Sequence, residues 1–202
     1  MRFTLHYEGP LVANGSASAK QTIREHFEPQ LKELWTHQPL ARAGQPSPLL
    51  RPFDVDDEGE VAFRDMMGTG TPRALVHAYG HVFAALVCEP LGLGAELEVL
   101  MLRPASPGQI VVGGGDIDNR LKTLFDGLSA PQQAQQVQMG TRATSDREPM
   151  FVLLDDDNRI TRISVETDRL LNPPEPSYVR LFIRVTTRVL NPSLSNIELG
   201  LN

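Results

Sequence analysis

Two segments of the chain alternate apolar and polar side chains with the period of a β-strand. The first, "SYVRLFIRVTTRVL" at 177–190, has an apolar set and a second set that includes two arginines: Val179, Leu181, Ile183 and Val185 against Arg180, Phe182 and Arg184. The second, "GAELEVLMLRP" at 94–104, sets Leu97, Val99 and Met101 against Glu96, Glu98 and Leu100. Because successive side chains of a strand point to opposite faces, each segment predicts a strand with one apolar face that must be covered.

Two amphipathic helices are predicted to cover such a sheet. In residues 16–35 the apolar side chains recur every four positions, at Ile23, Phe27, Leu31 and Trp35. Pro29 falls inside this pattern and predicts a break or a kink. In a second helix, from Asn119 to Leu128, one apolar stripe has the spacing i, i+3, i+4, i+7: Leu121, Leu124, Phe125 and Leu128.

The remaining segments complete an α+β fold. Residues 2–7 predict an opening strand, and 149–171 predict strand, turn and strand. Residues 73–91 fit a strand or a helix, and the histidines within them, His77 and His81, fit a partly polar surface better than a metal site because H-E-x-x-H is absent. Loops are predicted at three places: 38–60, 67–73 and 129–148. We expect one domain over 1–202, with a mixed sheet packed against at least two helices.

Composition limits the function classes. The net charge of −6 and the pI near 5.4 count against sequence-independent nucleic-acid binding, which relies on lysine and arginine. The chain has three lysines, and its arginines gather near the C-terminus, where they fit either phosphate contacts or a solvated strand face. A lone cysteine, Cys88, and the absence of a signal peptide or a long apolar run predict a cytoplasmic protein with no membrane contact.

The stretch "GGGDIDNRLKTLFDGL", residues 113–128, carries the strongest chemical signal. Asp118 can cap the start of the helix and pair with Lys122 one turn later, but a cap leaves Asp116 unexplained. Two carboxylates this close repel each other unless a proton or a cation lies between them, and Mg²⁺ or Mn²⁺ would serve. The sequence places three more acids at Asp155, Asp156 and Asp157, where a polar turn is the alternative interpretation.

Both acidic segments resemble the RusA family of Holliday-junction resolvases, which are small phage-associated endonucleases. The family pattern D-x-D-N, a lysine, D-x-L and a later acidic pair is matched by Asp116, Asp118, Asn119, Lys122, Asp126 and Leu128. Ile160 sets the register of the distal acids, so the pair is Asp156 and Asp157, and Asp155 is an extra acid. The resemblance covers about residues 94–190, and residues 1–93 form an N-terminal elaboration of this RusA-like core.

The resemblance implies a Mg²⁺- or Mn²⁺-dependent endonuclease that cleaves branched DNA in recombination or repair and works as a homodimer. Asp116, Asp118 and Asp157, with Asp156, would hold the metal, and Lys122 would approach the scissile phosphate. Further DNA contacts are expected from Arg120, Arg159 and Arg162. The long segment between Asp126 and Asp155 and the acidic pI keep a second interpretation open, a catalytically silent module that binds nucleic acid or protein. A metal-dependent phosphoesterase acting on a small nucleotide is a third.

Overall fold

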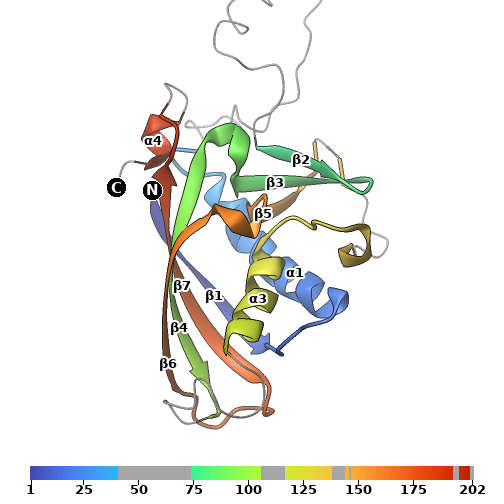
Figure 1. The fold of residues 1–202 in the computed structure, drawn as a ribbon, viewed down its shortest axis with the longest axis vertical. Coiled ribbons are helices and arrows are strands. Elements are labelled where there is room, and N and C mark those ends of the chain that lie inside the picture. Colours follow the sequence, from blue (N-terminus) through green and yellow to red (C-terminus); the bar gives the residue numbers. More distant parts are fainter. Residues whose placement is uncertain (41–73, 106–116, 138–143, 146, 193–195, 201–202) are drawn as a thin grey trace, which may run out of the picture.

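A four-stranded sheet forms one side of the α+β fold seen in the computed structural model, which describes residues 1–40, 74–105, 117–137, 144–145, 147–192 and 196–200 (Figure 1). The strand order is β1 (Arg2–Pro10), β7 (Tyr178–Val189), β4 (Leu93–Arg103) and β6 (Ile160–Arg169). Strands β1 and β4 run antiparallel to β7, whereas β6 runs parallel to β4, so the sheet is mixed as predicted.

The two alternating segments form the central strands of this sheet, and their apolar sets face inward. Leu97, Val99, Leu181 and Ile183 are at most 2% exposed. The opposite face is solvated, and its arginines pair with acids on neighbouring strands: Arg184 with Glu98 at 3.0 Å, Arg188 with Glu96 at 2.9 Å and Arg180 with Glu8 at 3.4 Å. These three arginines of β7 therefore belong to a solvated strand face, the second of the two predicted alternatives.

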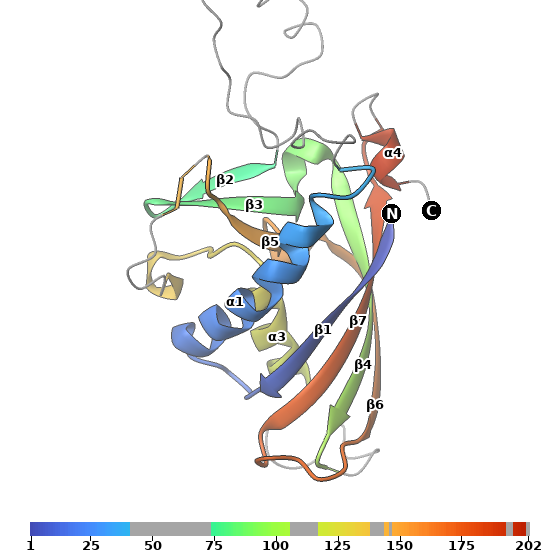
Figure 2. The same ribbon diagram turned by 180° about the vertical axis from the view of Figure 1, so that it is seen from behind.

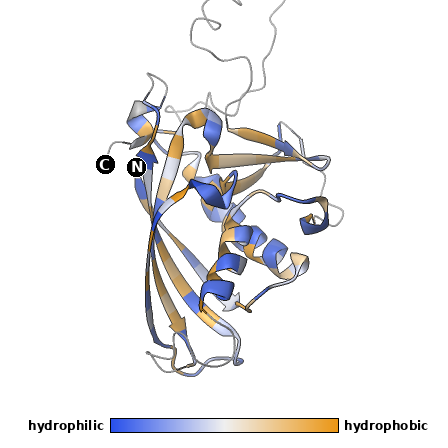
Figure 3. Ribbon diagram, in the orientation of Figure 1, coloured by the Kyte–Doolittle hydropathy of each residue, from blue (hydrophilic) through white to orange (hydrophobic). Residues whose placement is uncertain are grey.

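A smaller sheet holds β2 (Leu75–Ala78), β3 (His81–Val87) and β5 (Met150–Leu154), with β3 in the middle. Strands β3 and β5 run parallel and are almost continuously buried, and Figure 3 shows both as largely hydrophobic. Residues 75–87, for which strand and helix both fitted, form a hairpin whose two-residue turn, Tyr79 and Gly80, has φ of 52° and 79°. The turn places His77 and His81 on different strands, so the helical metal-site spacing does not apply.

Helix α1 (Ala17–Leu34) and helix α3 (Ile117–Leu128) lie on the inner side of the large sheet, as both ribbon views show (Figures 1 and 2). Ser16 caps α1 by accepting a hydrogen bond from the Ala19 amide at 3.2 Å. The helix continues through Pro29, which is exposed, so the chain does not break there. Helix α3 begins at Ile117, two residues before its predicted start at Asn119.

The two helices cross closely at Gly127. A Cβ at this position would lie 2.5 Å from the Ile23 side chain and 3.3 Å from the Lys20 carbonyl oxygen. Next to the crossing, Arg24 of α1 is 1% exposed and donates hydrogen bonds to the carbonyl oxygens of Asp126 at 2.9 Å and Ser129 at 3.0 Å. A helix leaves its last carbonyls without partners of its own, so Arg24 acts as a C-terminal cap supplied by another helix.

One hydrophobic core joins the N-terminal elaboration to the predicted RusA-like segment. Strand β1 pairs with β7 along nine residues, and α1 packs against both α3 and β5. Three short helical turns, η2 (Glu89–Leu91), η3 (Ala134–Gln136) and η4 (Asp157–Arg159), and the short helix α4 (Ile197–Gly200) complete the described elements. Within the described residues, no helix has the length and hydropathy needed to cross a membrane. The predicted loop 67–73 and most of 38–60 lie outside the described residues.

Candidate functional site

The acidic segments meet beside the C-terminal half of α3. Ser129, directly after α3, bridges to Leu154 at the end of β5, and the next amide, Ala130, donates to the Leu154 carbonyl at 3.0 Å. Because the acidic turn 155–157 follows Leu154 at once, this short pairing brings the turn to the helix. About thirty residues of sequence separate the two parts, so only the fold could show that they converge.

The three aspartates of the turn have different environments. The Asp155 carboxylate accepts hydrogen bonds from Arg159 Nε at 3.1 Å and from the Glu89 amide at 2.8 Å, so it fixes the turn. Asp156 accepts from the Asn158 amide at 2.9 Å and thereby caps η4. Asp157 is exposed and faces α3. Asp155 and Asp156 therefore hold the turn through these hydrogen bonds, and the role of Asp157 as a metal ligand stays a prediction.

The electrostatic neighbours of Asp157 identify the helix face that it approaches. Partial loss of hydration raises the pKa of Asp157, and the carboxylates of Asp156 and Asp126 raise it further. The hydrogen bond with Asp156 acts in the same direction, and the positive charge of Lys122 acts in the opposite one. Asp157 therefore lies within electrostatic range of two acids and one lysine, and perturbed carboxyl groups of this kind are candidates for a functional site.

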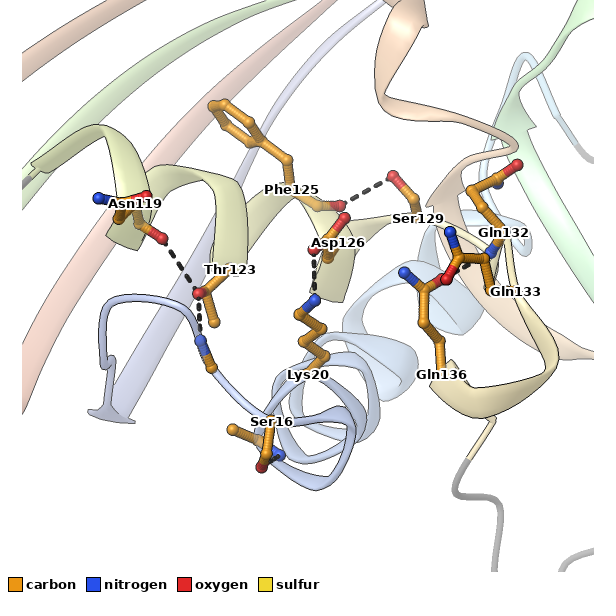
Figure 4. A network of polar contacts seen from close by, with 12 residues as sticks. Ser16, Lys20, Asn119, Thr123, Phe125, Asp126, Ser129, Gln132, Gln133 and Gln136 are labelled. Atoms are coloured by element: carbon orange, nitrogen blue, oxygen red, sulfur yellow. Dashed lines mark hydrogen bonds and ion pairs between the residues drawn. The ribbon is translucent and has the colours of Figure 1, made fainter.

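Lys122 and Asp126 differ in their availability. Asp126 pairs with Lys20 of α1 at 2.7 Å, and the two side chains are only 17% and 18% exposed (Figure 4). Lys122 is exposed and forms no ion pair with any other described residue. Lys20 was missed in the sequence, where nothing marks a lysine on α1 as a partner of an acid more than a hundred residues away.

The N-terminal half of α3 is held by its own contacts. Thr123 Oγ1 accepts a hydrogen bond from the Gly15 amide at 2.9 Å and donates to the Asn119 carbonyl at 3.1 Å, as Figure 4 shows. Asp118 is exposed in the first turn and accepts from the Asn119 amide at 2.9 Å. Among the described residues Asp118 makes no ion pair with Lys122, so the alternative of a simple i, i+4 salt bridge is not realised.

Only some of the predicted metal ligands belong to the described residues. Asp116 and the glycines 113–115 lie outside the described residues. Within the described ranges, no three His, Cys, Asp or Glu side chains form a group that could hold a metal ion. The acid of α3 that acts on Asp157 is Asp126, whereas Asp118 lies two turns earlier on the helix. The ligand set Asp116, Asp118 and Asp157, with Asp156, stays a prediction.

The arginines expected at DNA occupy three different settings. Arg120 donates to the Leu11 carbonyl oxygen, and burial and then the charge of Arg103 lower its pKa. Arg159 holds Asp155 and pairs with Glu89 at 2.8 Å. Arg162 lies on the solvated outer face of the large sheet, 3.9 Å from Glu96, and thus away from α3. Of the predicted DNA contacts, Lys122 is the one that stands exposed at the junction of α3 and the acidic turn.

Comparison with models of protein families, with curated proteins and with solved structures gave no match to this chain.

Proposed function

We propose that the chain is a divalent-metal-dependent endonuclease of the RusA type that hydrolyses phosphodiester bonds in branched DNA. The observation that carries the proposal is that the bridge from Ser129 to Leu154 brings the acidic turn to the C-terminal end of α3. Asp157 of the turn is exposed and lies within electrostatic range of Lys122, which is exposed on α3, and both belong to the pattern that resembles the family. The pairing of Asp155 with Arg159 supports it, because it leaves the next acids for other roles.

The chemistry of the donors fits a hard divalent cation. The acids concerned offer only carboxylate oxygens, which Mg²⁺ and Mn²⁺ prefer, and no histidine or cysteine belongs to the set. Asp157 and Asp118, with Asp116 and Asp156, would hold the ion. Loss of hydration, and then the negative charges of Asp156 and Asp126, raise the pKa of Asp157, and a bound cation would favour its ionised form. When bound, the ion would activate a water molecule and neutralise charge on the phosphate.

The residues of the chain have separate tasks in this proposal. Lys122 binds a phosphate oxygen of the DNA as a point charge, because its ammonium is exposed and makes no ion pair with the other described residues. Lys20 neutralises Asp126 and so keeps that acid from adding a free negative charge next to the phosphate. Arg24 and Thr123 hold α3 against α1 and the loop before it, which keeps Lys122 and Asp118 in place.

A cleavage assay tests the proposal. The protein is incubated with four-way and flapped DNA in Mg²⁺, beside the variants Asp157→Asn, Asp118→Asn and Lys122→Ala. We expect each variant to lose cleavage by about a hundredfold or more, the scale of removing one group that stabilises the transition state. The control Asp168→Asn makes the same chemical change on β6 and should cleave like the unaltered protein. Equal cleavage by Asp157→Asn would contradict the proposal.

Metal binding is tested separately from cleavage. Mn²⁺ at about a hundred times its dissociation constant should stabilise the fold by about 2.7 kcal/mol, which is readily measured as a rise in Tm. Asp157→Asn should show a much smaller rise. If Mn²⁺ stabilises neither form, while the protein binds DNA without cutting it, the catalytically silent module becomes the better interpretation.

A further inference from the structure

A pocket of about 730 Å³ opens between the β2–β3 hairpin and the acidic turn. Apolar groups from Val76, Pro90 and Pro131 line it, together with the ring of Tyr79 and the amide of Asn158. Pockets of this size suit small organic ligands, and a few polar groups among apolar ones give them orientation. Asp156 is the one residue of its lining to which the proposed hydrolysis gives a task.

The acidic turn separates the pocket from the candidate site. Asp156 lines the pocket, whereas the charges of Lys122 and Asp126 on α3 act on its neighbour Asp157. Consecutive Cα atoms are about 3.8 Å apart, so the backbone of Asp157 lies one residue from the wall of the pocket. A nucleotide carries its base and its phosphate on different sides of the sugar, so a base in the pocket leaves its phosphate outside it.

Tyr79 occupies a backbone position that is unusual for an aromatic residue. It is the first residue of the two-residue hairpin turn, with φ of 52°, where asparagine or glycine is strongly preferred. Its side chain is 50% exposed, so burial does not account for the choice. Its hydroxyl donates to the Gln132 backbone carbonyl at 2.7 Å, and the side-chain Nε2 of Gln132 donates to the Asp155 backbone carbonyl at 2.6 Å. The ring is thus tied to the acidic turn at the wall of the pocket, and strained positions of this kind gather at binding sites.

The charges of the pocket favour a base over a phosphate. Two of its acids, Glu89 and Asp155, are paired with Arg159, and Asp156 adds a further carboxylate. Carboxylates repel phosphate but accept hydrogen bonds from the exocyclic amino groups of bases. An exposed aromatic ring offers a stacking surface for any planar base. The lining therefore suits a neutral planar ring that carries an amino group.

We propose that this pocket binds an unpaired, amino-bearing nucleobase of the DNA, stacked on Tyr79, while the phosphate of the same nucleotide lies at Lys122. The inference rests on the proposed function, because it assumes that DNA approaches α3. It adds a reason for acting on branched DNA, since a paired base inside a duplex has no access to a side pocket.

Equilibrium binding without metal tests the pocket independently of cleavage. Fluorescein-labelled branched DNA carries at one junction position an unpaired adenine, an unpaired thymine or an abasic site, and anisotropy in EDTA gives each dissociation constant. We expect adenine to bind about tenfold more tightly than the abasic site, from stacking, and more tightly than thymine. Tyr79→Asn removes the ring but suits the turn, since Asn-Gly is favoured there, and it should abolish the preference. Tyr79→Phe keeps the ring and should retain it.

Each outcome separates the two proposals. An adenine preference that Tyr79→Asn abolishes supports the pocket, even if Mg²⁺ produces no cleavage and the nuclease proposal fails. No preference in the unaltered protein, a preference that Tyr79→Asn retains, or no binding of DNA at all overturns the pocket. Asp157→Asn serves as the cross-check, because it should lose cleavage and keep the adenine preference.

Discussion

Replacing Arg24 with methionine should destabilise the protein by removing the cap of α3. The guanidinium donates to the carbonyls of Asp126 and Ser129 and to the Gln21 side chain at 2.6 Å, all in a site that is 1% exposed. Burial lowers the pKa of Arg24 to about 10, so it stays charged at neutral pH. The two bonds to the carbonyls, at about 1.5–3 kcal/mol each, are lost together with the bond to Gln21, and relief of the guanidinium's desolvation offsets a large part of that. We expect a net loss of about 2–4 kcal/mol.

Urea unfolding followed by Trp35 fluorescence measures this loss. Trp35 is the single tryptophan and is 4% exposed, so its emission should report on the core. The expected loss corresponds to a fall in Tm of about 4–16 °C for a chain of this size. Arg24→Lys keeps the charge but not the forked donors, so its free energy of unfolding should lie between those of the unaltered protein and Arg24→Met. A loss below about 0.5 kcal/mol for Arg24→Met would refute the capping argument.

Three further predictions concern packing and charge. Gly127→Ala should destabilise by about 1 kcal/mol in urea unfolding, because overpacking against Ile23 outweighs the gain in helix propensity, and a more stable variant would contradict the close crossing. Asp157→Asn should raise Tm at pH 7 and lose that advantage near pH 3, since a raised folded-state pKa makes ionisation unfavourable to folding; an equal rise at both pH values would contradict this sign. Arg184→Ala should change the free energy of unfolding by less than about 1 kcal/mol and leave DNA cleavage intact. A loss of cleavage would instead indicate that Arg184 contacts a phosphate of the DNA.

The elements with strong periodicity could be predicted from the sequence. The alternation in β4 and β7 and the four-residue spacing in α1 gave the element types and the buried faces, because each pattern repeats over several turns or pleats. For the segment of β2 and β3 the sequence does not decide between strand and helix, because a short buried apolar run has no polar face that would show its period. The two positive φ values at Tyr79 and Gly80 decided it in favour of a hairpin.

The candidate site shows where sequence reasoning stops. The sequence predicts Asp157 and Lys122 as site residues, and Ile160 sets the register that distinguishes Asp157 from Asp155. The partners that define their settings come from distant segments: Lys20 for Asp126 and Glu89 for Asp155. Such contacts depend on how α1 and the β3–β4 connection pack, and one sequence records no trace of them.

The acids near α3 and in the acidic turn are only partly matched by basic side chains. Of the described acids on α3 and the acidic turn, Asp126 pairs with Lys20 and Asp155 pairs with Arg159, whereas Asp118, Asp156 and Asp157 form no ion pair with another described residue. Burial raises the pKa of the Asp157 carboxyl, and the charges of Asp156 and Asp126 raise it further. These unpaired carboxylates offer the oxygen ligands that divalent cations prefer, and they therefore favour the proposed metal site.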